Sequence, residues 1–321
     1  IEAMSILKDA SATAVYGSRA TNGIIQVQTK KGKEGKASVE YDFNMSFAQP
    51  SIWPEKMGSY QRALYANIAR ENDGLDPLYD QAALTAFQTG SDPLNFADTD
   101  WRKLVLNDWA PQQKHTVRVT GGNESNRYYL SLGHIDQNSL YKNDNHWMKR
   151  TNFRVAQSAN IEAIGLQINT AIDGYRQHQT HPYTSTADRY YGVFSHINNK
   201  YPNIPGVNKY GLPYNITDNP VAETAKDAGY NRTISNVING KGELIWTVPW
   251  LKELKVRAAS NYRYYSNSTK KWRKDAAQYD WDSQEPLYAN KPLLRYENSN
   301  GYAFTNQAFL EYAKEFGKHH V

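Results

Sequence analysis

A strict two-residue alternation of apolar and polar side chains constrains this chain more than any other feature. Between Ser38 and Phe47, five apolar residues fall on one face of an extended backbone and five polar residues fall on the other. The apolar set is Val39, Tyr41, Phe43, Met45 and Phe47, and the polar set is Ser38, Glu40, Asp42, Asn44 and Ser46. A period of two predicts a β-strand, because successive side chains of a strand point to opposite faces. About ten residues is also the length that a tilted strand needs to cross a bilayer.

The alternation recurs along the chain and predicts a protein built mainly from long strands. The predicted strands cover residues 37–49, 113–123, 127–137, 149–162, 166–178, 232–248, 254–273 and 301–316. Their polar face carries Glu, Asp, Lys and Arg, so we expect a wide, wet or plugged interior rather than a small closed barrel. An open sheet of this kind needs further strands as partners for both of its edges.

The connectors between the predicted strands form a second, independent pattern. Short links alternate in strict order with long connectors, and the long ones cover residues 50–112, 138–148, 179–231 and 274–300. Outer-membrane barrels combine short periplasmic turns with longer extracellular loops in this way. The first long connector also has helical spacing at 59–72 and 81–88, with Ser59 as a candidate helix cap.

Composition limits the classes of protein to which the chain can belong. No apolar run approaches the roughly 18 residues of a transmembrane helix, and a mean hydropathy of -0.76 is compatible with the polar lumen and loops of a barrel. The chain has no cysteine, which removes disulfide and thiolate chemistry. Its net charge of +5 is mostly scattered, so we expect no nucleic-acid partner. The 24 Tyr and 8 Trp residues suit membrane-interface girdles or a ligand surface, and we interpret Trp246 and Trp250 as girdle anchors.

Residues 1–36 differ from the rest of the chain. Spacing predicts a strand over 1–7, a short helix over 10–16, a strand over 24–29 and a charged hinge over 30–36. By themselves these residues indicate only an ordinary small β-α-β element. Their glycines do not form a phosphate loop, because no Gly-Lys-Ser/Thr sequence follows them.

Within this region, the segment LKDASATAVYGSRATNGIIQVQTKKGKEG (Leu7 to Gly35) closely resembles the end of the plug domain in the SusC/RagA family of TonB-dependent outer-membrane transporters. It departs from the family pattern at Ala20-Thr21, where Gly-Ala is more common, and this mild change affects no expected function. Further resemblance lies at Asp100-Trp101, at residues 115–137 and at residues 304–321. The similarity covers nearly the whole chain, and 179–231 is its least typical part.

The resemblance implies an all-β fold: part of a 22-stranded transmembrane antiparallel barrel, with the carboxyl-terminal end of an α+β plug inside it. We therefore expect residues 1–36 to form the end of the plug domain and hinge, and 37–321 the first barrel strands with long extracellular loops. Because residue 1 is Ile and the sequence stops within a predicted strand, we also expect an internal part of a longer polypeptide.

The resemblance also implies active import across the bacterial outer membrane. Expected partners are TonB, a SusD-like surface lipoprotein, outer-membrane lipid and a glycan, oligosaccharide or peptide substrate. The TonB-contacting segment is not part of this sequence. The alternative hypothesis is a non-transporting surface receptor or a soluble β-rich ligand-binding module.

The sequence also suggests where a ligand would bind. Connector 179–231 interleaves tyrosines with asparagines, and connector 274–300 adds a further aromatic residue. Aromatic faces bury the apolar surface of a sugar and amides reach its hydroxyls. The candidate ligand-binding residues are Tyr183, Tyr190, Tyr191, Phe194, Asn198, Tyr210 and Trp281. Alternatively, the tyrosines form a small core within the loop and the asparagines make turns.

No catalytic motif stands out, and we expect no enzyme activity and no catalytic residue. His178 and His181 have three-residue spacing without a nearby acidic helix, so they do not form a zinc-protease motif. Asp98, Asp100 and Asp108 lack the spacing of an EF-hand. Members of the resembled family bind Ca²⁺ in loops, but no residue set here is assignable to a metal or other cofactor.

Overall fold

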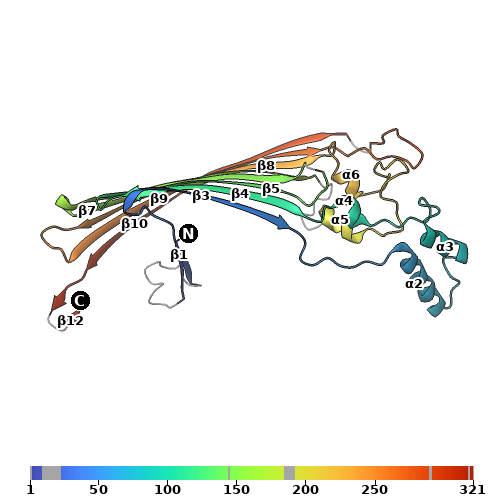
Figure 1. Ribbon diagram of the computed structural model, residues 1–321, viewed down its shortest axis with the longest axis horizontal. Helices are drawn as coiled ribbons and strands as arrows, with labels where there is room; N and C mark the ends of the chain where they lie inside the picture. The colour runs from blue at the N-terminus through green and yellow to red at the C-terminus, as the bar shows by residue number, and fades with distance from the viewer. Residues whose placement is uncertain are drawn as a thin grey trace.

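The chain folds into a long curved antiparallel sheet with a head of helices and loops at one end (Figure 1). The coordinates are a computed structural model, and the structure describes residues 2–8, 23–143, 145–183, 192–288, 291–316 and 319–320. The helix predicted over 10–16 lies outside these residues. None of the helices in the described residues combines the length and apolar character needed to cross a membrane.

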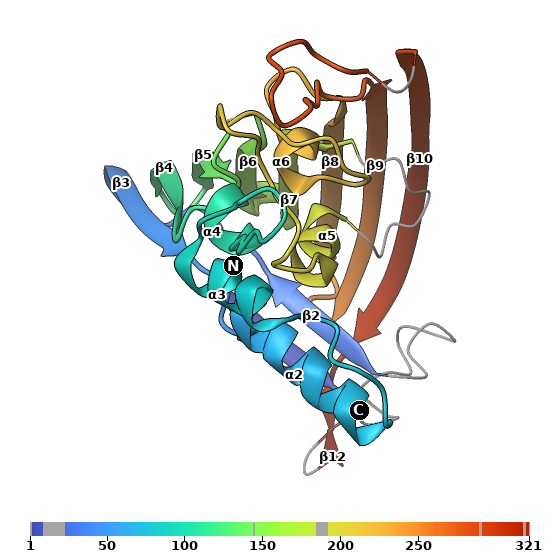
Figure 2. The same ribbon diagram turned by 90° about the vertical axis from the view of Figure 1, so that its right-hand side faces the viewer.

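Eight strands form the sheet, here called the wall, and each pairs with its neighbour in sequence. They are β3 (Gly35–Ala48), β4 (Ala110–Gly122), β5 (Asn126–Asn138), β6 (Trp147–Ile161), β7 (Leu166–Pro182), β8 (Tyr230–Thr247), β9 (Leu254–Arg273) and β10 (Leu293–Tyr312). All eight predicted strands are present, but β7 continues to Pro182, and β10 covers Leu293–Tyr312 rather than the predicted 301–316. The last connector therefore covers residues 274–292 and is shorter than the predicted 274–300. The wall does not close, since β3 and β10 remain at its two edges (Figure 2).

The register divides the wall into an apolar convex face and a polar concave face. Val39 of β3 pairs with Val119, which pairs in turn with Leu130, and the same ladder row reaches Val155 and Ile172. The concave row one residue away contains Glu40 opposite Arg118, followed by Ser131 and Arg154. The alternation read from the sequence therefore sorts side chains onto the same two faces in every strand.

The apolar band on the convex face moves along the strands from one edge of the wall to the other. The ladder row that begins at Val39 ends at Phe304 of β10. In β3 the band extends from this row toward the head, as far as Phe47. In β10 it extends in the opposite direction, as far as Leu310. Such a drift is expected where strands are tilted and staggered in a barrel wall.

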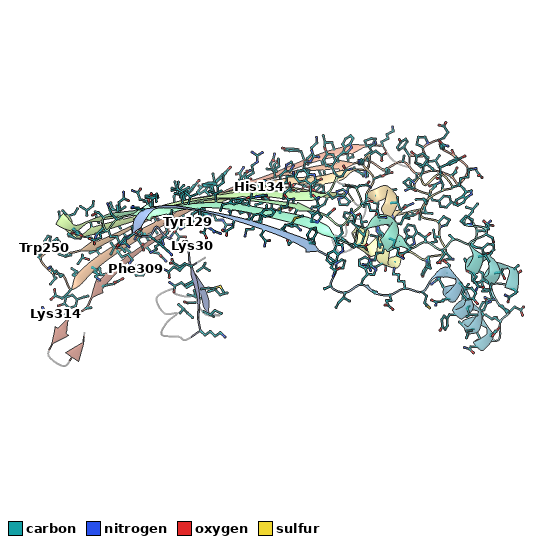
Figure 3. The ribbon with its side chains drawn as sticks, viewed as in Figure 1. Lys30, Tyr129, His134, Trp250, Phe309 and Lys314 are labelled. Carbon is teal, nitrogen blue, oxygen red and sulfur yellow. The ribbon has the colours of Figure 1, made fainter. Side chains whose placement is uncertain are left out.

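Tight turns join the strands at the end of the wall away from the head. Asn123 accepts hydrogen bonds through Oδ1 from the backbone N–H groups of Ser125 and Asn126, at 3.1 and 2.8 Å. Gly165 has a φ of 64°, and a Cβ there would lie 2.3 Å from the carbonyl oxygen of Thr247, so this turn requires glycine. The neighbouring turn carries Trp250, which is 80% exposed at this end of the wall (Figure 3).

An amino-terminal hairpin lies under the concave face (Figure 1). It pairs β1 (Ala3–Leu7) with β2 (Ile24–Gln28) in antiparallel order. The residues that follow contact the wall: Arg154 donates to Thr29 Oγ1 at 2.7 Å, and the backbone N–H of Lys33 donates to Thr120 Oγ1 at 3.1 Å. Arg154 also pairs with Asp173 of β7 at 2.7 Å. Residues 29–34 are therefore held against the polar, concave side of the sheet.

The head is built from the long connectors. It contains α2 (Ser59–Asn72), α3 (Gln81–Thr89), α4 (Trp101–Val105), α5 (Val193–Asn199) and α6 (Pro220–Glu223). The helices predicted in the first connector are confirmed, but Ser59 does not cap α2. Gly58 occupies the cap position, and the Ser59 N–H instead donates to Asp98 Oδ1 at 2.8 Å. The remaining short elements are η2 (Glu162–Ile164), β11 (Glu315–Phe316) and β12 (His319–His320).

Candidate functional site

The head has its own hydrophobic core, which fixes the loops relative to one another. Its buried members are Trp101, Val105, Leu106, Tyr141, Val193 and Ile197. They come from α4, α5 and the connector between β5 and β6, three segments that are far apart in the sequence. Burial of these side chains makes the head a packed module rather than a set of separate loops.

Two buried asparagines tie the carboxyl-terminal loops of the head together. Asn219 is fully buried, accepts from Val221 N–H to cap α6, and donates to the carbonyls of Gly206 and Tyr214 at 3.0 and 2.8 Å. Asn208 donates to the carbonyls of Asp280 and Ser283 at 3.0 and 2.9 Å. The Asn208 bonds join residues 192–229 to residues 274–288, and the Asn219 bonds hold residues 206–221 together within the first of these connectors.

The first cleft of the head, here called the Trp53 cleft, has a volume of about 520 Å³. Its lining includes Trp53, Lys56, Asp98, Arg102 and Lys200. The Arg102 guanidinium lies 5.1 Å from the centre of the Trp53 ring, and Lys56 Nζ donates to the carbonyl of Ile197 at 3.0 Å. The cleft therefore combines an aromatic wall with groups of both charges.

A second cleft, the Trp281 cleft, has a volume of about 640 Å³. Trp281 lines it together with Lys103, Lys142 and Lys209. Lys209 pairs with Asp282 at 2.7 Å, while Lys103 pairs with Asp100 at 3.4 Å and is 86% exposed at its side chain. Exposed lysines around an indole ring suit a ligand that carries hydroxyl, carbonyl or carboxylate oxygens.

The third cleft, the Tyr183 cleft, is smaller at about 420 Å³ and lies between Tyr183, Asp218, Glu223 and Tyr288. Beside it, His196 Nδ1 and Glu223 Oε2 lie 2.7 Å apart and both side chains are nearly buried. The hydrogen bond to Glu223 raises the pKa of His196, and burial raises the pKa of Glu223. The pKa of each partner is thus shifted in the direction that favours holding a proton between them.

Possible metal ligands meet at the same place. One ligand atom each from His196, Asp218 and Glu223 lie within 4.8 Å of one another. This set does not fit Ca²⁺, which takes six to eight oxygen ligands, and the His196 Nδ1 is already bonded to Glu223. The cluster is explained by the ion pair between His196 and Glu223, with Asp218 beside it.

Comparison with known proteins finds relatives of the chain in sequence and in fold. No family model matches it. It is 27% identical over 320 residues to the TonB-dependent receptor SusC of Bacteroides thetaiotaomicron, covering 90% of this chain and 30% of that receptor. Its fold matches the RagAB peptide importer in the closed-closed state with a TM-score of 0.73 at 20% identity, over 98% of this chain and 36% of that one.

The chain is SusC/RagA-like. A third relative, the TonB-dependent receptor P39 of Formosa agariphila, is 21% identical over 100% of this chain and 28% of its own length. The SusC/RagA-like chain thus spans about a third of the length of the proteins that it matches. Its open, curved sheet is part of a barrel wall of the RagA kind. These relatives are receptors and importers, and none is named as an enzyme.

The SusC/RagA-like chain does not gather its sequence-predicted ligand residues in one cleft. Tyr183 lines the Tyr183 cleft and Trp281 lines the Trp281 cleft. Tyr210 is 47% exposed, and its ring centre lies 5.1 Å from Lys209 Nζ at the edge of the Trp281 cleft. Tyr190 and Tyr191 lie outside the described residues.

Phe194 and Asn198 belong to α5, close to the Trp53 cleft. Phe194 packs against Trp53 and Tyr141, with ring centres 6.4 and 5.4 Å apart. The backbone carbonyl of Asn198 accepts a hydrogen bond from Lys56, while its side-chain Oδ1 is buried without a partner among the described residues. Phe194 is 39% exposed and lies outside the buried core of the head, so both residues remain candidates for ligand contact.

Sequence reasoning missed several residues that line the clefts. Trp53, Lys56 and Arg102 come from the first connector, where the sequence offered helical spacing but no aromatic-amide cluster. The Trp-Pro pair at 53–54, followed by Glu55 and Lys56, was the available signal. The clefts form between connectors that are far apart in sequence, so no single stretch reveals them.

Proposed function

We propose that this chain forms part of an active importer of the bacterial outer membrane that is energised through TonB. In this proposal residues 1–36 are the end of the plug domain and hinge, residues 37–321 are barrel wall with extracellular loops, and the head captures the substrate. A SusD-like surface lipoprotein would cover the head. The family likeness supports this assignment, since the relatives are named TonB-dependent receptors.

One observation supports the proposal above all others: the wall presents an apolar convex face and a polar concave face that holds residues 29–34. Val39, Phe43 and Phe304 are 71%, 53% and 62% exposed on the convex face. A soluble binding module would bury side chains of this kind, whereas lipid covers them in a membrane. The concave face instead binds the amino-terminal segment through Arg154 and Thr120, as expected for a plug held inside a barrel.

The clefts favour a substrate with polar or charged groups, namely a glycan, an oligosaccharide or a peptide. The RagAB neighbour is a peptide importer. The Trp53 and Trp281 clefts offer an indole ring beside Lys and Asp side chains, which match a peptide with charged ends or an acidic sugar. Capture at these clefts would precede a rearrangement of the plug that opens the path through the wall.

The test is uptake and binding by the full-length protein, with peptide and oligosaccharide mixtures as separate probes. Trp281→Ala should weaken substrate binding about tenfold, because an aromatic anchor at a binding surface contributes roughly 1–2 kcal/mol. Trp250→Ala, at the opposite end of the wall, serves as the matched control and should leave binding unchanged. Uptake that persists without TonB or without a proton-motive force would refute active import.

A further inference from the structure

Basic residues gather on the convex face of the wall just beyond its apolar band, on the side nearest the head. Arg176 of β7 lies four residues beyond Ile172, Arg232 of β8 lies two beyond Ile234, and Lys270 of β9 lies six beyond Tyr264. The strand rise and barrel tilt place such positions about 5–15 Å beyond the hydrocarbon boundary. This is the level of lipid headgroups and not of lipid tails.

The register brings these cations together. Arg232 lies directly opposite Lys270 in the β8–β9 ladder, and the row-mate of Arg232 on β7 is Thr180. Arg176 and Arg232 both lie close enough to His178 to interact with it electrostatically. Like charges directly opposite on one face of a sheet destabilise it, so the arrangement of Arg232 and Lys270 has a cost that an anion between them would remove.

The described part of the chain does not supply that anion. Among the described residues, no ion pair involves Arg176, Arg232 or Lys270. The acid on this part of the convex face, Asp136, already pairs with Lys149 at 2.9 Å. The contrast within β9 is direct: Lys271, on the concave face next to Lys270, pairs with Glu297 at 2.9 Å.

Polar atoms and aromatic rings complete the cluster. Arg232 Nε and His178 Nε2 are buried without a hydrogen-bond partner among the described residues. The Arg232 guanidinium lies 4.5 Å from the centre of the Tyr230 ring, and Tyr230 is directly opposite Trp272. The His178 ring lies 4.7 Å from that of Trp147. Amphipathic rings of this kind concentrate at membrane interfaces, where cations meet anionic headgroups.

We propose that Arg176, Arg232 and Lys270, with His178 between the first two, form a site on the outer wall for the phosphate groups of an outer-leaflet glycolipid. The proposal rests on the proposed function, which turns the convex face to lipid and the head to the outside. Arg232 and Lys270 hold one phosphate between them, and Arg176 reaches a second anionic group of the same headgroup. Charge complementarity and the position beyond the apolar band select a lipid headgroup over a protein partner.

The experiment reconstitutes the full-length protein in lipid nanodiscs and counts bound lipid by native mass spectrometry. The probes are phosphorylated lipid A, dephosphorylated lipid A and free inorganic phosphate. The double variant Arg232→Gln/Lys270→Gln should bind phosphorylated lipid A about 10- to 30-fold more weakly than the unmodified protein. The matched control is Lys241→Gln/Arg263→Gln, which removes two cations from the concave face of the same two strands and should retain binding.

Specific outcomes overturn the site. Equal retention of phosphorylated lipid A by both double variants would do so, as would equal retention of dephosphorylated lipid A by the unmodified protein. Free phosphate that displaces the lipid at millimolar concentration would show an anion site without headgroup recognition and would also overturn it. If uptake and membrane insertion persist in any of these cases, the transport proposal stands. A protein that does not insert in the nanodiscs contradicts both proposals.

Discussion

The wall and the head differ in how much of their apolar side chains they bury. In the wall, large apolar residues on the convex face stay exposed, as with Val39 at 71% and Leu310 at 76%. In the head, Trp101 and Ile197 are 4% and 1% exposed within a core of their own. The head therefore buries its apolar side chains within the chain, whereas no described residue covers the convex face of the wall, as the proposed contact with lipid requires.

This difference separates the forces that hold the two regions. The wall is held by continuous ladders of backbone hydrogen bonds that leave both edges, β3 and β10, unpaired by any described strand. The head is held by side-chain packing and by buried amides such as Asn208 and Asn219. Damage to one region should therefore leave the other largely intact, and each prediction below tests that independence.

The largest effect is expected from removal of the central side chain of the head. Trp101→Ala should destabilise the head by about 3–5 kcal/mol, because it leaves a cavity and removes the hydrogen bond from Nε1 to the Tyr201 carbonyl at 3.0 Å. Hydrogen exchange should speed up in α4 and α5 and stay unchanged in the strand ladders. Trp109→Ala, at a position 51% exposed, is the control and should shift exchange little. Faster exchange throughout the wall would show that the two regions unfold together.

The second prediction addresses the wall alone. Phe43→Arg places a charge in the middle of the convex apolar band of β3 and should cost about 2–4 kcal/mol of folding free energy in a bilayer. Asn44→Arg, one residue along on the concave face, is the matched control and should cost much less. Reversible unfolding by denaturant in lipid vesicles measures both. Equal stability of the two variants would mean that the convex face of β3 does not contact hydrocarbon.

The strands of the wall were predicted well because the alternation of apolar and polar residues within each strand shows which face is apolar. An alternation such as that of Val39 to Phe47 needs only neighbouring residues to be recognised, and it fixed strand identity and the assignment of the faces. It failed at the end of β10 nearest the head, where Leu293 and Leu294 are adjacent apolar residues and Glu297 follows. There the strand is defined by pairing with β9, which extends to Arg273.

The candidate site was less predictable because it depends on contacts across long stretches of sequence. Aromatic and amide enrichment identified connectors that line the Tyr183 and Trp281 clefts. It could not distinguish a buried structural amide such as Asn208 from an exposed one, since burial is set by residues some 70 positions away. For the same reason it missed Lys56, which meets α5 from a distant connector.

The last prediction is that the stability of the head, but not that of the wall, falls at acidic pH. His146 is 3% exposed in the head, neither ring nitrogen has a hydrogen-bond partner among the described residues, and burial with the nearby charge of His181 lowers its pKa to about 4. The pKa of His146 is lower in the folded state than in the unfolded state. The neutral ring therefore contributes fully to the stability of the head above about pH 6.5, and this contribution is lost as the pH falls toward 4.

We therefore expect the head to lose up to about 3 kcal/mol between pH 6.5 and pH 4, while the strand ladders keep their protection from exchange. Hydrogen exchange of α4 and α5, corrected for the intrinsic rate at each pH, measures the loss. In the variant His146→Gln the side chain does not titrate, and the substitution breaks no hydrogen bond of the His146 ring among the described residues. The loss of stability of the head between pH 6.5 and pH 4 should therefore be smaller in this variant. An unchanged step would assign the acid sensitivity to another group, and an equal loss in the wall would contradict the independence of the two regions.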